Sequence, residues 1–263
     1  MNKRGVILDS FFLLVRRIIP ASTRFFLRNK IWNYKVKAGK VDSGYIVDLS
    51  ENDGIWCASV NDSDFYILTI KRWALYAQGL QNSFEQLARA YGHNKYFTIQ
   101  KGDVVVDIGA NVGMFSRFAD SCGSSVVYSM EADKDIFKIL NKNIENYNIV
   151  ANNYPIWNEN TNLTFFHAMG SADSSIIEPE EFTYSSIQKA VTLDWALSKY
   201  SIDAIKVIKC DAEGAEPEVL NGARETLKKT MFIAFDCGAE RKGETTIKEC
   251  VKIIKEVGFE VLT

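Results

Sequence analysis

The pattern of apolar and polar positions changes near residue 100. From Lys101 onward, short apolar runs alternate with amphipathic stretches. This pattern predicts strands over 104–108, 126–131, 149–157, 161–168, 204–211, 231–236 and 259–262, and helices over 113–122, 133–147, 192–200, 216–229 and 245–257. Strands that alternate with helices in this way form a parallel sheet with helices on both faces. We therefore expect an α/β, Rossmann-like fold with a mostly parallel, doubly wound sheet over residues 99–263.

Residues 1–98 have a different pattern. Residues 6–19 show the periodicity of an amphipathic helix, which Pro20 should end, and a short basic and aromatic piece follows at 24–28. Three short strands are predicted at 44–49, 55–60 and 65–70, and a helix at 83–91. The first 98 residues are thus predicted to form an amphipathic helix and a small, β-rich α+β cap.

The charge of the chain is concentrated at its N-terminus. Nine Lys/Arg and one acid give residues 1–37 a charge of +8, which leaves −10 on the rest of a chain with net charge −2. An acidic body disfavours nucleic acid as a partner. The basic helix suits either peripheral contact with an anionic membrane or burial on the α/β domain. Five cysteines without C-x-x-C spacing indicate reduced thiols, and the two histidines exclude a His-rich metal site. We expect a cytoplasmic protein whose residues 1–37 can contact the inner membrane surface.

A glycine loop follows the first strand of the α/β domain, in the run Asp107-Ile-Gly109-Ala110-Asn111-Val-Gly113. Gly109 permits a tight turn and the close approach of a ligand, and Gly113 permits close packing of helix on strand. Position 111 is Asn, so the spacing differs from the G-x-G-x-x-G of dinucleotide-binding loops, and the G-x-x-x-x-G-K-[ST] phosphate loop is also missing. An acid followed by this G-x-x-x-G spacing suits a ligand with an amino-acid tail and no pyrophosphate.

Acidic residues end two further predicted strands. Glu131 ends strand 126–131, where a carboxylate can accept hydrogen bonds from both hydroxyls of a ribose. Alternatively, Glu131 belongs to the N-cap region of helix 133–147, a role that Asp133 could fill equally well. Strand 204–211 ends in Asp211, which Glu213 and Glu216 follow. Glu216 suits the N-terminus of the next helix. Asp211 lies on the strand end itself, where ligands bind in open α/β sheets, so a helix terminus explains it poorly.

The glycine loop, Glu131 and the run Lys209-Cys-Asp211-Ala-Glu213-Gly214-Ala-Glu216 together resemble the FkbM-type family of S-adenosylmethionine-dependent methyltransferases. Members usually carry a K-I-D-V-E-G-A-E type run, so Cys210 and Ala212 are departures that leave the acids and the glycine in place. The resemblance implies a class I methyltransferase fold, S-adenosylmethionine as cofactor, and O-methylation of a sugar, glycolipid or related metabolite. The residues expected to hold the cofactor are Asp107, Gly109, Ala110, Asn111, Gly113, Glu131 and Ala132.

Methyl transfer to a hydroxyl requires an in-line arrangement and benefits from a base within hydrogen-bond reach. Asp211 is the first candidate for this base, Glu213 the second and His167, at the end of a predicted strand, the third. We expect no dedicated metal site, although clustered carboxylates would also suit Mg²⁺. The segment 169–190 is expected to form a loop that closes over the acceptor.

Two other functions compete with methyl transfer. A nucleotide-dependent oxidoreductase is disfavoured by the spacing of the glycine loop. A non-catalytic binding subunit on a methyltransferase scaffold is disfavoured because Asp107, Glu131 and Asp211 are all present.

Overall fold

The chain forms two compact units, Met1–Ser83 and Phe84–Thr263. The computed structural model describes residues 20–41, 44–168, 174–179, 181–241 and 243–262. The division between the units falls inside helix α3 (Leu80–Ala90), earlier than the predicted boundary at residue 98. Phe84 belongs to the second unit, where its ring lies 6.0 Å from the guanidinium of Arg117.

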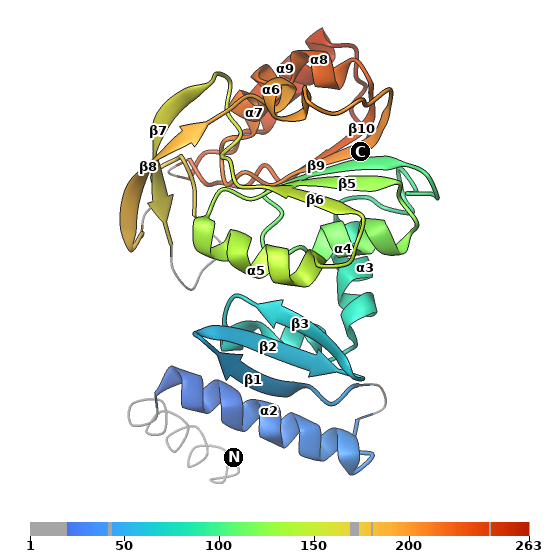
Figure 1. Cartoon of the computed structure of the whole chain (residues 1–263), viewed down its shortest axis with the longest axis vertical. Helices are drawn as coiled ribbons and strands as arrows, with labels where there is room; N and C mark the ends of the chain where they lie inside the picture. Colours follow the sequence, from blue (N-terminus) through green and yellow to red (C-terminus); the bar gives the residue numbers. More distant parts are fainter. Residues whose placement is uncertain (1–19, 42–43, 169–173, 180, 242, 263) are drawn as a thin grey trace, which may run out of the picture. The chain divides into compact units, whose positions relative to one another are not determined.

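The first unit is a helix with a small antiparallel sheet. It contains α2 (Ala21–Lys37), β1 (Asp48–Asn52), β2 (Ile55–Val60), β3 (Ser63–Ile67) and the 3-10 helix η1 (Ile70–Tyr76), with the strands in the order β1-β2-β3 (Figure 1). The prediction of three short strands is confirmed, and β2 matches its predicted range. The predicted bounds of the other two are wrong, since β1 begins at Asp48 instead of residue 44 and β3 ends at Ile67 instead of residue 70. The pattern also missed most of the 17-residue helix α2. The helix predicted over 6–19 lies outside the described residues. In the part of the chain that the structure describes, no helix is both long and apolar enough to cross a membrane.

The second unit is built on a five-stranded parallel sheet, so the predicted α/β fold is confirmed. Its strands are β4 (Val104–Ile108), β5 (Val126–Met130), β6 (Ile149–Asn152), β9 (Ile205–Cys210) and β10 (Thr230–Phe235), in the order β10-β9-β4-β5-β6. One face carries α4 (Met114–Ser121) and α5 (Lys134–Ile144). The other carries α6 (Leu193–Leu197), α7 (Glu216–Asn221), α8 (Arg224–Leu227) and α9 (Ile247–Glu256) (Figure 1). The apolar strands are buried between these layers because helices cover both faces.

The strand order creates a switch point between β4 and β9. The chain runs outward from β4 to β5 and β6, and later returns to the other side of β4 to form β9 and β10. Connections that leave in opposite directions open a crevice at the carboxyl ends of the strands, where open α/β sheets bind their ligands. The loops that follow β4 and β9 meet at this point, and they contain Gly109 and Asp211.

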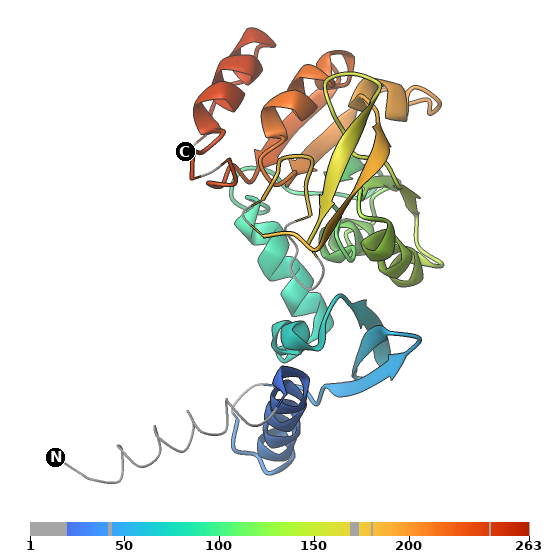
Figure 2. The ribbon, with the colours of Figure 1, turned by 90° about the vertical axis from the view of Figure 1, so that its left-hand side faces the viewer.

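A separate hairpin, β7 (Thr161–His167) and β8 (Tyr184–Ala190), stands beside the parallel sheet (Figure 2). It pairs His167 with Tyr184 and Thr161 with Ala190. The prediction of a loop over all of 169–190 is therefore wrong for 184–190, because the alternation of this segment matches the facing strand. Residues 169–173 lie outside the described part of the chain.

Two further predictions need correction. The helix predicted over 216–229 is divided into α7 and α8. The break lies at Gly222, which packs so closely that an added Cβ would lie 2.0 Å from the carbonyl oxygen of Trp157. Residues 259–262 form no strand, since the backbone N–H of Phe259 donates to the carbonyl of Ile254 at the end of α9.

Candidate active site

The glycine loop after β4 is held by close packing. The backbone N–H groups of Gly109 and Ala110 both donate to the carbonyl of Met130, each at 3.0 Å. Gly109 has φ 69°, and an added Cβ would lie 1.8 Å from the carbonyl oxygen of Asp211. A Cβ on Gly113, where φ is 93°, would lie 2.7 Å from the Leu140 side chain of α5. Gly109 therefore requires glycine for conformation and for space, and Gly113 requires it for conformation.

A buried polar row supports this loop from below. Asp107 lies in register with Lys209 of β9 and with Ser129 of β5. The Lys209 ammonium lies 3.3 Å from Asp107 Oδ1 and donates to the Gly109 carbonyl at 2.7 Å. Ser116 of α4 donates to Asp107 Oδ2 at 2.6 Å. Burial alone would lower the pKa of Lys209, but the carboxylates of Asp107 and Asp211 outweigh it and raise that pKa. Asp107 has no exposed surface, so in this structure it supports the loop through Lys209.

Glu131 ends β5 with a buried carboxylate. Its two oxygens accept the backbone N–H groups of Asn111 and Asp133, each at 2.8 Å. Burial raises the pKa of Glu131 to about 7, although these two N–H donors oppose the shift. Each carboxylate oxygen has two lone pairs, so both retain capacity for another donor. Glu131 is therefore fixed in place while remaining able to accept two more hydrogen bonds.

The remaining predicted cofactor residues lie around this carboxylate. Asn111 has a left-handed backbone, φ 51°, which directs its N–H to Glu131, and its side-chain oxygen accepts the N–H of Val112 at 2.8 Å. The Asn153 amide donates to the carbonyls of Glu131 and Ala132, at 2.8 and 3.1 Å. The loop after β4 and the segment after β5 are thus joined into one rigid edge.

Asp211 follows β9 and has one anchored oxygen. The hydroxyl of Tyr91 donates to Asp211 Oδ2 at 2.8 Å, and the Lys209 ammonium lies 3.8 Å from the same oxygen. Burial and the nearby Asp211 charge raise the pKa of Tyr91, so its hydroxyl stays protonated and donates. The Asp211 side chain is 32% exposed. A carboxyl group that is both fixed and accessible suits contact with a bound molecule.

The two other acids of this loop differ from Asp211. The Glu216 carboxylate accepts the N–H groups of Ala212 and Gly214, each at 3.1 Å, and the Thr246 hydroxyl at 2.9 Å. Glu216 thus lies in the first turn of α7, as predicted, and its carboxylate holds the loop that precedes the helix. Glu213 is half-buried with a left-handed backbone, φ 49°, and its carbonyl accepts the Ser175 hydroxyl at 2.9 Å. Among the described residues, no three His, Cys, Asp or Glu side chains are grouped to hold a metal.

His167 lies in a buried network at the end of β7. Its Nδ1 lies 2.9 Å from Asp133 Oδ2, and its Nε2 lies 2.8 Å from the Ser186 hydroxyl. Asp133 also caps α5 and accepts the Ser174 hydroxyl at 3.1 Å. The ring of Tyr184 stacks on His167 with centroids 4.2 Å apart. His167 thus connects the hairpin to the segment after Glu131, and its hydrogen bonds do not include Asp211.

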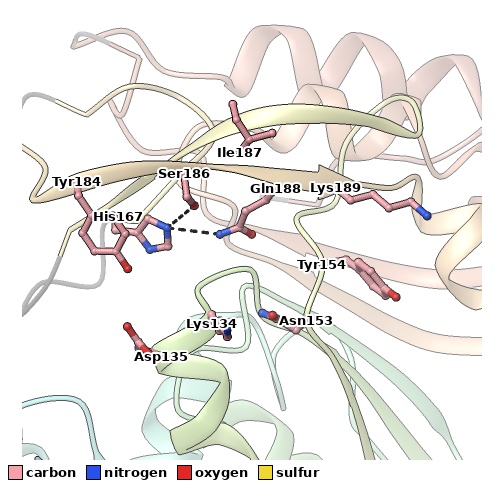
Figure 3. A pocket seen from close by; sticks show the side chains of 10 residues that line it. All are labelled: Lys134, Asp135, Asn153, Tyr154, His167, Tyr184, Ser186, Ile187, Gln188 and Lys189. Atoms are coloured by element: carbon pink, nitrogen blue, oxygen red, sulfur yellow. Dashed lines mark hydrogen bonds between the residues drawn. The ribbon is translucent and has the colours of Figure 1, made fainter.

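A pocket of about 380 Å³ opens between the hairpin and the start of α5 (Figure 3). Nine of its ten lining residues carry a hydroxyl, amide, imidazole or charged group. The lining residues are Lys134, Asp135, Asn153, Tyr154, His167, Tyr184, Ser186, Ile187, Gln188 and Lys189. Figure 3 shows the Ser186 and Gln188 side chains directed toward the His167 ring. The pocket therefore offers many hydrogen-bonding groups beside the network that holds Asp133.

Two residues of this arrangement were missed as site residues by the sequence analysis. Lys209 carried a signal, since a lysine inside an otherwise apolar strand must find a buried partner. Tyr91 carried none, because it lies 120 positions before Asp211 and only the fold brings the two together.

Comparison with known proteins identifies the second unit. The model described as Methyltransferase FkbM domain matches residues 107–261, more than half of the chain. No curated protein matches the sequence significantly. Similar solved structures include Aeropyrum pernix fibrillarin with natively bound S-adenosyl-L-methionine, with 12% identity, TM-score 0.43 and coverage of 82% of this chain and 91% of that one. Precorrin-6y C5,15-methyltransferase from Geobacter metallireducens has 11% identity and TM-score 0.39, with 68% and 72% of the two chains covered.

Proposed function

Because the chain belongs to the FkbM methyltransferase family and uses S-adenosylmethionine, we propose that it methylates a hydroxyl group of a sugar, glycolipid or related metabolite. The observation that carries this proposal is the Asp211 carboxylate, anchored by Tyr91 and Lys209 beside the glycine loop. The family match favours methyl transfer over the oxidoreductase alternative.

The residues around Glu131 fit S-adenosylmethionine by their chemistry. Two lone pairs remain on a carboxylate that backbone N–H groups already fix, and the two hydroxyls of a ribose supply two matching donors. We assign Glu131 to the ribose, with Gly109, Ala110, Asn111, Gly113 and Ala132 forming the surrounding edge. When bound, the cofactor supplies an electrophilic methyl group. Asp107 supports this edge through Lys209, which bonds to the Gly109 carbonyl.

Asp211 is proposed to orient the acceptor hydroxyl and to accept its proton. Tyr91 and Lys209 both contact Oδ2. A carboxylate held at one oxygen loses much of its rotational freedom, and Oδ1 is proposed to receive the acceptor hydroxyl. A fixed base near its substrate contributes by orientation and by proton removal. Glu213 is the second candidate for this role, and His167 is reassigned to positioning Asp133 and the hairpin.

The polar pocket beside the hairpin supports a polyhydroxylated acceptor. Asn153, Ser186 and Gln188 are amide and hydroxyl groups, which both donate to and accept from sugar hydroxyls. Lys134 and Lys189 add positive charge, which suits an acceptor that carries a phosphate or carboxylate. The aromatic ring of Tyr154 offers a flat apolar surface on the same wall.

A labelling experiment tests the proposal. The full chain is incubated with S-adenosylmethionine carrying a ¹³C methyl group, together with separate pools of free sugars, nucleotide sugars, glycolipids and small amines. We expect one labelled methyl group in a sugar or glycolipid pool, bound to oxygen by its ¹³C chemical shift. Label that appears only on nitrogen or carbon, or in the amine pool alone, would contradict hydroxyl methylation. S-adenosylmethionine would still be consumed in that case. The result would therefore contradict the proposed acceptor class without contradicting the methyltransferase activity.

A further inference from the structure

Helix α2 has two dissimilar faces. Its inner face packs within the first unit, where the amides of Asn29 and Asn33 donate to the carbonyl of Val47 at 2.8 and 2.9 Å. On the same face Trp32 packs against Trp73 with ring centroids 6.4 Å apart. Asn29 is 3% exposed. These contacts fix which side of the helix points away from its own unit.

The opposite face exposes three large apolar side chains. Leu27, Ile31 and Tyr34 are 44%, 56% and 64% exposed. Their spacing of four and three residues aligns them in one row along the helix, because an α-helix has 3.6 residues per turn. We call this row the outer stripe. Such a contiguous apolar row marks a contact surface more often than a single exposed residue does.

Every charged residue of α2 is basic. The helix contains five Lys/Arg and no Asp or Glu. By helical geometry Arg24, Arg28 and Lys35 lie on one side of the outer stripe, and Lys30 and Lys37 lie on the other. The last four of these in sequence, Arg28 onward, are exposed. The outer stripe therefore has cations along both edges, and basic residues beside an apolar contact are attracted to the anionic lipids of a membrane surface.

We propose that the outer face of α2 docks on an anionic lipid surface, with the outer stripe inserted among the headgroups and the flanking cations near the lipid phosphates. Charge complementarity selects this partner. Residues 38–263 carry −10 and are repelled by such a surface, whereas residues 1–37 carry +8 and are attracted. A second copy of the chain is a poor partner for the same face, because five cations would meet five cations. Long basic side chains can also extend along a lipid interface while their apolar stems stay buried.

Vesicle sedimentation of the full chain tests this docking. The probe is phosphatidylcholine vesicles with about 30% phosphatidylglycerol, compared with pure phosphatidylcholine at about 50 and about 500 mM salt. The test variant combines Arg28→Gln, Lys30→Gln, Lys35→Gln and Lys37→Gln. The matched control removes four exposed charges of the second unit, by Lys101→Gln, Lys248→Gln, Lys252→Gln and Lys255→Gln. The two variants have equal net charge, so a difference between them reports position.

The native chain is expected to sediment with anionic vesicles at low salt, and to do so much less at high salt. The α2 variant should partition about 100-fold more weakly or worse, and the control should change little. A second variant, Leu27→Ser with Ile31→Ser, removes the outer stripe without changing charge and should also weaken partitioning. Circular dichroism and S-adenosylhomocysteine binding verify that both variants remain folded.

Three results would overturn the proposal. If the native chain does not sediment with anionic vesicles at low salt, the outer face of α2 is not a lipid-docking surface. Equal partitioning of the native chain and both α2 variants would assign the attraction to residues 1–19. A dimer in sedimentation equilibrium that Ile31→Asp dissociates would assign the outer stripe to a second copy of the chain.

Discussion

Lowering the pH from about 8 to about 6 should weaken the binding of S-adenosylhomocysteine, because Glu131 must be charged to accept both ribose hydroxyls. Burial raises the pKa of this carboxyl to about 7 in the unliganded protein. A protonated carboxyl turns one of its oxygens into a donor, which removes an acceptor that the ribose needs. Binding of the ribose is therefore coupled to loss of a proton from Glu131.

The expected magnitude follows from linkage. One pH unit below a pKa of about 7, roughly a tenth of the carboxyl groups are charged, so the dissociation constant at pH 6 should be about tenfold larger than its plateau. The stability of the fold depends on pH in the opposite direction: the contribution of Glu131 to stability decreases as the pH rises. A pKa raised from 4.5 to about 7 makes the charged form unfavourable in the fold by about 3 kcal/mol. The stability that protonation provides is present below 4.5 and is lost as the pH rises through about 7.

Calorimetry measures this coupling directly. Titration of the full chain with S-adenosylhomocysteine between about pH 5.5 and 8.5 gives the affinity, and buffers of different ionisation enthalpy give the number of protons released. Near pH 6 close to one proton should leave per ligand bound. Glu131→Gln is the control, because it removes the titrating group while keeping the size of the side chain. The variant should bind more weakly and show a flatter pH profile.

A flat profile for the native chain between pH 5.5 and 8 would refute this reasoning. Proton release that is equal in the native chain and in Glu131→Gln would assign the titration to another group. Either result would leave the family assignment intact, and it would remove Glu131 as the ribose acceptor.

Three substitutions test the rest of the site. Asp211→Asn should lower methyl transfer by about 100-fold while leaving S-adenosylhomocysteine affinity unchanged, and unaltered turnover would show that this acid is not the base. Tyr91→Phe should lower the turnover rate by about tenfold at constant cofactor affinity, since one hydrogen bond to a charged group is lost, whereas Tyr96→Phe should have no effect. Gly109→Ala should destabilise the protein far more than Gly102→Ala in thermal denaturation. Both glycines have positive φ, but only at Gly109 would the methyl group meet the carbonyl oxygen of Asp211.

Local patterns were sufficient to locate the five strands of the parallel sheet and the glycine loop. Apolar runs such as 104–108 and 204–211 reveal buried strands because helices cover both faces of the sheet. The break at Gly222 could not be found in this way. It depends on the approach of Trp157, which is far away in the sequence. The hairpin strand 184–190 was missed for a similar reason. Its residues are mostly polar, and they form a strand because they pair with β7.

For the site, the sequence predicted where the candidate residues lie in the fold, but it did not predict which groups they bind. Glu131 and Asp211 lie at the strand ends where the pattern placed them. His167 was considered as a base because it is one of two histidines near a predicted site, yet both of its ring nitrogens are bound to Asp133 and Ser186. A sequence shows which groups can exchange protons, but not which of them are already occupied by neighbours.

The buried pair of Asp107 and Lys209 shows how the two loops of the site depend on each other. Lys209 lies between Asp107 and Asp211, and it also bonds to the carbonyl of Gly109. Its single charge therefore lies between the carboxylate under the glycine loop and the carboxylate in the loop after β9. A buried ion whose partner is removed is costly, so any shift of the glycine loop that breaks this contact is opposed by both acids. The same contacts that fix the glycine loop thus also fix the orientation of Asp211, so in the proposed mechanism cofactor binding and the position of the base depend on each other.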